Sequence, residues 1–357
     1  MFNVAEFGAA ADGVTDSTPG IQAAVDAAVK AGGGTVLVPS AKSPYLVRRT
    51  ITINGSGVEV SGRGARLLLA DGAINGQVAP VILFTGTAAS PLHGVALRGL
   101  TVDANYFNQA RAKNSKAVVM KFVEDSVVED VLITRPYVGL SIRRSDRVSA
   151  RRVTVTDYQE DGFDAGGDAD EIPGGKCRRI TFTDVVARDA PRDAWDGNAF
   201  EIEDGAEDIL IQDALVENVA GNGAGLRNHK SQDNHSRGVE LRNVTFRKIT
   251  GFALFGRAAP RENSGTNSYR EIRLVNLTAD APVLLWGPID KLEIVGGRYT
   301  TLHLGFESPT GAATIPNALS DATIKDVEAE NIRVNGASER ISFTGARARS
   351  IEQVRAR

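Results

Sequence analysis

The sequence contains only one cysteine, Cys177, in 357 residues, which excludes an internal disulfide and a cysteine-rich metal site. Such a lone cysteine is predicted to be a small, buried apolar side chain. No run of about 18 apolar residues is present, so no transmembrane helix is expected. The net charge is only −3, which gives no reason to expect a nucleic-acid or membrane partner.

Aromatic residues are also scarce, at 6% of the sequence. A long, shallow carbohydrate-binding surface would more naturally carry aromatic rings along its length. The first residues lack the basic and then apolar pattern of a signal peptide. An earlier-removed leader, another export route and an intracellular location all remain compatible with this beginning.

The sequence does contain a short pattern that recurs from one end to the other, with alternating apolar residues on both sides of a turn-forming residue. Two short strands that meet at a bend produce such a pattern. The steps of about 19 to 37 residues are typical of repeat proteins, in which each coil buries its inner face against the next. The sequence therefore predicts an all-β fold, a parallel β-helix of about ten coils. The marker residues at the bends are Gly62, Gly99, Asp130, Arg152, Asp184, Asp213, Asn243, Asn276, Gly296, Asp326 and Gly345.

Residues 1–50 differ from the repeats and predict an N-terminal cap, with the β-helix itself over residues 51–357. Capping-type residues at 16–18 precede Pro19, which suits the first position of a helix. Apolar residues then recur four apart on one face until glycines at 32–34 end the predicted helix. A helix at this place would cover the open end of the first coil and block pairing of its edge.

Three segments are polar and lack the alternation of strands. We predict that they are loops at the corners of coils, where repeat proteins often carry binding residues. They span residues 104–116, 165–177 and 258–270.

The opening segment NVAEFGAAADGVTDSTPGIQAAVDAAVKAGGGTVLVP closely resembles the start of pectate-lyase-superfamily β-helix proteins, especially the catalytic module of mannuronan C5-epimerases. The resemblance covers about a tenth of the chain. It implies right-handed winding, a polysaccharide or oligosaccharide substrate in a groove along one strand face, and a secreted or cell-surface location. Lyases, epimerases, hydrolases and phage tailspikes carry similar segments, so the fold does not select the reaction.

Alignment of the second strand of each coil predicts which side chains are neighbours on the outer face, because alternate residues point outward. The inward residues aligned are Leu140, Phe163, Phe200, Leu226 and Phe252. One outward column then contains Ser141, Asp164, Glu201, Arg227 and Ala253, and the next contains Arg143, Gly166, Glu203, His229 and Phe255.

Outward positions of any such fold are polar, and opposite charges on neighbouring strands also stabilise a sheet. We nevertheless predict a functional site, because Asp, Glu and Arg share one register on three consecutive coils. The predicted catalytic residues are Asp164, Glu201, Arg227 and His229. The predicted substrate-binding residues are Asp161, Arg143, Trp195, Asp196, Glu203, Lys230 and Lys113.

One motif of the epimerases can be compared residue by residue. The family motif is Tyr-Gly-Phe-Asp-Pro-His, and residues 161–166 here are Asp-Gly-Phe-Asp-Ala-Gly. Asp161 and Gly166 thus replace the tyrosine and histidine that are catalytic in the family. Tyr158 and His229 are the nearby candidates to substitute for them. The family also carries a lysine in the preceding loop, where either Lys113 or Lys116 would stand.

Three functions fit this predicted site. In a uronate lyase or C5-epimerase, a cation stabilises the enolate formed when the proton beside the carboxylate is removed. Arg227 or Arg143 would then clamp the carboxylate, and His229, Lys230 or Arg227 would act as the base. Ca²⁺ is an optional cofactor, with Asp164, Glu201 and Glu203 as its oxygen ligands.

The second function is a glycoside hydrolase or transglycosylase that uses Asp164 and Glu201, whose carboxyl groups would be about 5 Å apart. The third is a non-catalytic, tailspike-like carbohydrate-binding protein. Alanine at Asp164, Glu201 or Arg227 is expected to abolish turnover without changing thermal stability, because all three are predicted to lie on the surface.

Overall fold

The strands and helices of the chain are defined by a computed structural model. It describes residues 1–74, 79–110, 115–167, 175–191, 197–227, 235–257, 268–286, 289–305, 319–335 and 338–354. The chain consists of two units, which are described separately. Unit 1 comprises Met1–Asp164 and Asp184–Pro191, and unit 2 comprises Ala165–Thr183 and Arg192–Arg357. The boundary falls within strand β15 (Phe163–Gly166).

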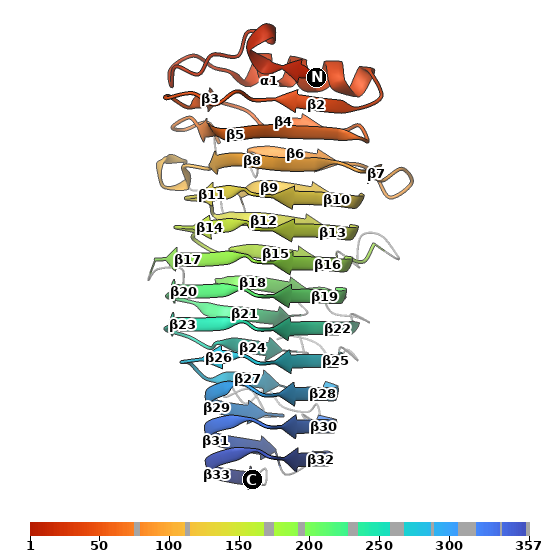
Figure 1. The fold of residues 1–357 in the computed structure, drawn as a ribbon, viewed down its shortest axis with the longest axis vertical. Coiled ribbons are helices and arrows are strands. Elements are labelled where there is room, and N and C mark those ends of the chain that lie inside the picture. The colour runs from red at the N-terminus through yellow and green to blue at the C-terminus, as the bar shows by residue number, and fades with distance from the viewer. Residues whose placement is uncertain are drawn as a thin grey trace. The chain divides into compact units, whose positions relative to one another are not determined.

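Unit 1 contains the helix α1 (Thr18–Lys30), the 3-10 helices η1 (Val4–Phe7) and η2 (Tyr106–Asn108), and short strands (Figure 1). Its strands are β1 (Phe2–Asn3), β2 (Gly34–Leu37), β3 (Tyr45–Val47), β4 (Ile51–Ile53), β5 (Val58–Leu69), β6 (Ile82–Thr85), β7 (Leu92–His93), β8 (Ala96–Asp103), β9 (Lys116–Lys121), β10 (Val123–Glu129), β11 (Leu132–Thr134), β12 (Val138–Arg143), β13 (Asp146–Arg151), β14 (Thr154–Thr156) and β17 (Val186–Ala190).

Unit 2 consists of strands in its described part. They are β16 (Arg178–Thr183), β18 (Asn198–Glu203), β19 (Glu207–Gln212), β20 (Leu215–Val219), β21 (Asn222–Arg227), β22 (His235–Arg242), β23 (Thr245–Ile249), β24 (Leu254–Arg257), β25 (Ser268–Val275), β26 (Thr278–Ala279), β27 (Val283–Trp286), β28 (Ile289–Val295), β29 (Arg298–Leu304), β30 (Leu319–Lys325), β31 (Glu328–Asn335), β32 (Glu339–Thr344) and β33 (Arg347–Val354).

Both units have the parallel pairing of a β-helix, in which each strand pairs with the equivalent strand of the next coil. In unit 1, β4, β6, β9, β12 and the start of β15 form one stack, here called the Lys116 stack. In unit 2, β18, β21, β24, β27 and β29 form the Glu201 stack. The predicted parallel β-helix is thus confirmed.

Inward side chains at one register form the core of each stack. In the Glu201 stack Phe200, Ala224, Leu254, Val283 and Leu302 are successive register partners, and all are fully buried. Each large apolar side chain buried in this way contributes about 1.5–3 kcal/mol. Such columns fix the faces of the strands, so the residues between them must point outward.

The marker residues are bends with left-handed backbone, as their residue types suggest. Asp213, Asn243 and Asn276 all have φ of 53°, a conformation that Asn and Asp tolerate better than most residues. Their side chains also form a ladder: Asn243 Nδ2 donates to Asp213 Oδ1 at 2.8 Å. The first marker was misplaced by two residues, since Gly64 rather than Gly62 has the positive φ of 75°.

The N-terminal helix α1 caps the first coil, as predicted. Ile21 and Val25 are fully buried on its inner face. The Gln22 side-chain amide makes the hydrogen bonds that a neighbouring strand would make with β4. Its Nε2 donates to Thr52 O, and Thr52 N donates to its Oε1, both at 2.9 Å. These two bonds satisfy backbone groups that an open sheet edge would leave unpaired. No described helix is long and apolar enough to cross a membrane.

A buried acidic residue, Glu207, is held by cations from three neighbouring strands and segments of unit 2. Its carboxylate lies 2.6 Å from Lys176 Nζ, 3.2 Å from Arg178 Nε and 3.6 Å from Arg237 NH2. Burial alone would raise the pKa of Glu207, but the hydrogen bond and charge of Lys176, with the two arginines, lower it below its usual range.

We expect Glu207→Gln to lower the free energy of unfolding by about 1–3 kcal/mol at pH 7, because three cations lose their shared carboxylate. The folded-state pKa lies below the unfolded value, so this contribution exists above about pH 4.3 and is lost as the pH falls through the folded pKa. Urea denaturation at pH 7 and pH 3 checks this. Glu217→Gln, which removes the half-exposed pair with Arg247, is the control with little effect. An equal loss at both pH values would contradict the prediction.

Candidate functional site

In unit 1 the Lys116 stack carries a buried carboxylate, Asp164, that is only 2% exposed. Lys116 Nζ donates to Asp164 Oδ2 at 3.0 Å, and Ser141 Oγ donates to the same oxygen at 2.8 Å. Arg143 NH1 lies 3.3 Å from the other oxygen, Oδ1. This Asp164 cluster therefore contains two cations around one carboxylate.

The register of the Lys116 stack places these groups next to one another. Leu140 N donates to Gly162 O at 3.0 Å, which sets Leu140 level with Phe163 and Ser141 level with Asp164. This is the predicted register. Lys116 comes from the first residue of β9, whose partner on β12 is Val138. Of the two candidate lysines, Lys116 contacts Asp164, and Lys113 lies outside the described residues.

In unit 2 the Glu201 stack carries a second buried carboxylate, Glu201, that is 3% exposed. Its Oε1 lies 3.6 Å from Arg227 Nε, and its Oε2 accepts a short hydrogen bond from Asn198 Nδ2. Asn198 Oδ1 in turn accepts from Asn222 Nδ2 at 3.1 Å. Two asparagines on neighbouring strands therefore orient one side of the Glu201 carboxylate, while Arg227 lies on the other.

The predicted register of the Glu201 stack was wrong by two residues. Glu201 is level with Gly225, whereas Arg227 is level with Glu203. Phe255 is level with Gly225 and so belongs to the column of Glu201. A slip of two residues leaves the inward and outward faces unchanged, so apolar alternation could not detect it. The Arg227 side chain still reaches Glu201 because it extends back along the strand face.

Gly225 is required for this arrangement. A Cβ at this position would lie 2.6 Å from Glu201 Oε2 and 2.7 Å from Asn198 Oδ1. The absence of a side chain gives the Glu201 carboxylate and its asparagine partner the space they occupy. In the sequence this glycine stands in the pattern Ala-Gly-Leu. The alignment treated it only as the small residue that precedes an apolar one.

A buried tyrosine, Tyr269, completes the electrostatic surroundings of the unit 2 cluster. Burial and then the negative charges of Glu201, Asp204 and Glu203 raise its pKa, while Arg227 lowers it slightly. The side chain is fully buried, and its hydroxyl has no hydrogen-bond partner among the described residues. It was not singled out from the sequence, because it lies on a strand outside the aligned set.

Several predicted site residues cannot be placed. His229, Lys230, Trp195, Asp196 and Lys113 lie outside the described residues. Their roles remain predictions.

Asp161 and Glu203 are described. Asp161 is half-buried just before β15, where its backbone O accepts from Gly139 N at 2.9 Å. Glu203 is 6% exposed and pairs in register with Arg227.

Asp164 and Glu201 are buried rather than on the surface as predicted. The exposed parts of the two clusters belong to cations: the side chains of Lys116, Arg143 and Arg227 are 20%, 24% and 16% exposed. Removal of either carboxylate would leave these cations without their partner, so the expectation of unchanged thermal stability is not supported.

Tyr158 was the candidate to replace the tyrosine of the family motif. It is fully buried in unit 1, and its hydroxyl has no partner among the described residues. Burial, followed by the charges of Asp161 and Asp189, raises its pKa well above the usual value. A phenol in this position cannot contact a substrate and is disfavoured as a base.

We therefore expect Tyr158→Phe to keep full activity and to leave the thermal midpoint unchanged or slightly raised. The change removes a buried hydroxyl that has no hydrogen-bond partner in the described part of the chain, and such a group costs free energy. Activity assays and thermal denaturation of the purified variant check this. A loss of turnover above tenfold in a folded variant would show that Tyr158 takes part in the reaction.

The donor atoms of the two clusters do not fit calcium. Ca²⁺ is bound by six to eight oxygen ligands, most often with several carboxylates. Asp164 is already surrounded by Lys116, Arg143 and the Ser141 hydroxyl, and Glu201 by Arg227 and the Asn198 amide. Cations and N–H donors thus occupy the positions that the metal would need.

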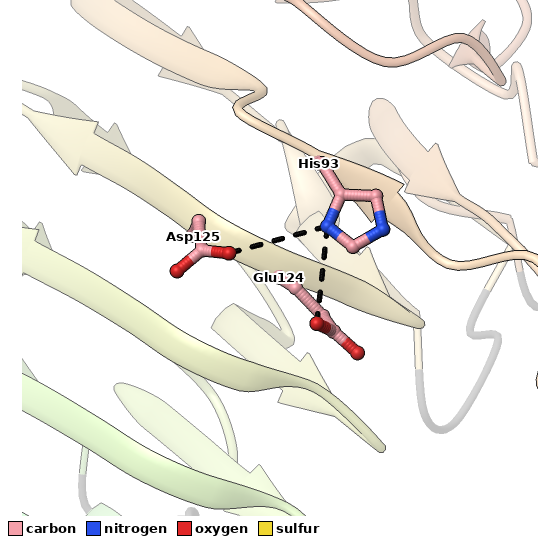
Figure 2. Close-up of side chains that lie close together, drawn as sticks. All are labelled: His93, Glu124 and Asp125. Atoms are coloured by element: carbon pink, nitrogen blue, oxygen red, sulfur yellow. Dashed lines mark ion pairs between the residues drawn. The ribbon is translucent and has the colours of Figure 1, made fainter.

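Figure 2 shows the one group of three metal-ligand side chains that lie close together in the described part of the chain. His93 Nδ1 is 3.8 Å from Glu124 Oε2 and 4.0 Å from Asp125 Oδ2. Arg147 donates to Glu124 at 2.9 Å and to both oxygens of Asp125, at 2.6 and 2.9 Å. The Arg147 guanidinium donates hydrogen bonds to both carboxylates, so this group is described as an ion-pair network of the coil surface.

Comparison with known proteins agrees with the fold. Residues 1–79 match the family described as rhamnogalacturonase A/epimerase, pectate lyase-like. Alginate lyase 7 of Azotobacter vinelandii is 67% identical over 39 residues, which are 11% of this chain and only 5% of that protein.

Two solved structures extend the likeness over nearly the whole chain. The A-module of mannuronan C-5 epimerase AlgE4 from Azotobacter vinelandii has a TM-score of 0.64 at 16% identity, covering 99% of this chain and 96% of the module. The catalytic unit of the GH87 alpha-1,3-glucanase from Streptomyces thermodiastaticus strain HF3-3 has a TM-score of 0.59 at 15% identity, covering 98% of this chain and 64% of that one. At these identities the likeness concerns the fold alone. The chain therefore resembles the pectate-lyase-like rhamnogalacturonase A/epimerase family at its amino-terminal segment and has the right-handed parallel β-helix fold of the epimerase modules.

Proposed function

We propose that this protein is a polysaccharide-processing enzyme that acts as a lyase or C5-epimerase on a uronate-containing polymer. One observation carries the proposal: in both clusters the carboxylate is buried and the exposed groups are cations. A substrate that meets Lys116 and Arg143 in unit 1, or Arg227 in unit 2, meets positive charge, which suits a sugar with a carboxylate.

The proposed chemistry begins with the substrate carboxylate, whose charge Arg143 or Arg227 neutralises. This makes the proton on the adjacent carbon, C5, easier to remove, because the resulting enolate is stabilised by the same cation. In a lyase the C4–O bond then breaks, its oxygen takes up a proton and becomes the end of the departing chain, and a C4–C5 double bond forms. In an epimerase the C4–O bond stays intact, and a proton returns to C5 from the opposite face. Asp164 and Glu201 hold the cations in place.

His229 and Lys230 remain the candidates for the base, together with Arg227. In the sequence they come two and three residues after Arg227, the last residue of β21. The AlgE epimerases and the alginate lyase among the relatives support a uronate substrate by their names alone. A polymer of this kind lies outside the cell, so we also propose a secreted or cell-surface location.

The runner-up is a glycoside hydrolase with Asp164 and Glu201 as its two carboxylates. Such an enzyme needs both carboxyl groups at the scissile bond. Their burial behind cations is less suited to that role. A non-catalytic, tailspike-like binding protein is the third possibility.

A panel of polysaccharides tests the proposal. Alginate, pectate, glucuronan, glycosaminoglycans and neutral glucans and fructans are incubated with the protein, with and without Ca²⁺, and the products are identified by mass spectrometry and proton NMR. We expect unsaturated ends or altered uronate configuration from one acidic polymer. Cleavage of a neutral glucan or fructan with gain of water would replace the proposal with the hydrolase, and binding without conversion would replace it with the binding protein.

A further inference from the structure

Unit 2 carries a group of aromatic rings on the outer side of the Glu201 stack. In β24 Leu254 is fully buried in the core, so the next residue, Phe255, points outward. In β27 Leu285 is likewise buried, and the next residue, Trp286, points outward. Both rings are half-buried rather than enclosed.

The rings contact one another in a fixed arrangement. The centroid of Phe255 is 5.0 Å from that of Trp286, with an interplanar angle of 72°. Phe252 stacks on Phe255 with centroids 5.7 Å apart at 25°. The backbone N of Phe252 donates to Asn222 Oδ1 at 3.0 Å. The asparagine pair that orients Glu201 thus also fixes the position of the aromatic group.

The register places this group directly beside the Glu201 cluster. Phe255 is level with Gly225, which is level with Glu201. Two strand spacings separate Phe255 from Glu201, about 9.6 Å. Gly225 contributes no side chain between them.

The Arg227 side chain lies close to both the Glu201 carboxylate and the Phe255 ring. Its Cζ lies 5.8 Å from the centre of the Phe255 ring, and its Nε lies 3.6 Å from Glu201 Oε1. A pyranose ring has an apolar face of C–H groups, which packs well on the electron-rich face of an aromatic ring. A uronate placed on Phe255 and Trp286 would bring its own carboxylate towards the Arg227 guanidinium.

We propose that Phe255 and Trp286 form a stacking subsite for one sugar ring of the polysaccharide, with Arg227 as its cation. The subsite rests on the proposed function, because it supplies the binding contact next to the Glu201 cluster. Sequence analysis did not find this subsite. The predicted register put Phe255 in another column, and the alignment did not include Trp286.

The test is a titration of purified protein with hexamannuronate and with hexagalacturonate. In the variant Trp195→Phe, Trp286 is the one remaining tryptophan, and its emission should change saturably as either oligosaccharide binds. Calorimetry should show that Phe255→Leu weakens binding about tenfold, because it keeps the apolar volume and loses the ring face. Phe255→Tyr, which keeps the face, should stay within about twofold of the wild type.

Phe343→Leu is the matched control, since it removes a 39% exposed ring in β32. It should bind as the wild type does. Unchanged affinity in Phe255→Leu, or binding to Trp195→Phe without any change in Trp286 emission, would overturn the subsite even if the polymer is converted. Binding with the Trp286 signal but no conversion would support the subsite and overturn the proposed reaction. Binding of neither oligosaccharide by the wild type would overturn both.

Discussion

Replacing Asp164 with asparagine is expected to lower kcat/KM by about 10³-fold or more on the polymer that the protein converts. The Asp164 carboxylate joins Lys116, Ser141 and Arg143 within 3.3 Å. Asparagine removes the charge that holds the two cations, so they would no longer be fixed where the substrate carboxylate must bind. Steady-state kinetics of Asp164→Asn against the wild type give the measurement.

Asp103→Asn is a matched control for this experiment. Asp103 is also buried in unit 1, and its two oxygens bind Arg135 Nε at 3.0 Å and Arg135 NH2 at 2.7 Å. Both variants should lose about 1–3 kcal/mol of stability, because each leaves a cation without its carboxylate. Only Asp164→Asn should lose activity. Equal activity in the two variants would remove Asp164 from the site.

The second large effect is expected from Gly225→Ala, which should lower kcat/KM about 100-fold. The added Cβ would lie 2.6 Å from Glu201 Oε2 and 2.7 Å from Asn198 Oδ1, closer than a Cβ atom approaches an oxygen to which it is not bonded. Glu201 would have to turn away, which would separate it from Arg227 and Asn198. Kinetics of the purified variant test this, with circular dichroism to show that the coils remain folded.

Gly256→Ala is the control that separates the effect of an added Cβ in the core from the effect of displacing Glu201. Gly256 lies on the next strand of the Glu201 stack, where a Cβ would meet Leu285 Cδ2 at 2.7 Å in the core. This variant should lose stability through overpacking and keep its kcat/KM. Unchanged kinetics in Gly225→Ala would mean that the position of Glu201 does not matter for turnover.

Much of the fold could be predicted because residue types indicate where the chain bends and which side chains are buried. Asp130, Asp184 and Asn243 combine a tolerance for left-handed backbone with apolar neighbours on both sides, and each has a φ between 53° and 56°. The error at the first bend has a simple cause. Gly62 and Gly64 are both glycines of one strand, and either satisfies the pattern.

The candidate site could be predicted only in part, because alternation defines a face but not a register. In unit 1 the alignment placed Ser141 beside Asp164, and the structure confirms that pairing. In unit 2 the segment with Gly225 and Leu226 offered two alignments with the same inward face. The chosen alignment placed Arg227 level with Glu201, whereas in the structure Arg227 is level with Glu203 on the neighbouring strand. Backbone hydrogen bonds, which local sequence does not encode, decided between them.

Burial was the other property that the sequence did not provide. Outward residues of a strand were expected to be exposed, yet Asp164 and Glu201 are 2% and 3% exposed. Long cationic side chains from neighbouring strands cover them, since Lys and Arg extend over adjacent surface while keeping their charged ends in water. In each cluster the exposed charge therefore comes from the cations, Lys116 and Arg143 in unit 1 and Arg227 in unit 2, rather than from the carboxylate.

A reaction in D₂O enriched with ¹⁸O is the sharpest test of whether the protein removes the proton at C5 of a uronate. The polymer that is converted in the panel is treated with wild-type protein, and the products are analysed by NMR and mass spectrometry. We predict that the C5 proton is lost to an unsaturated end or replaced by deuterium in the epimer, without ¹⁸O at a new chain end. Retention of the C5 proton together with ¹⁸O at a new reducing end would contradict it and identify a hydrolase.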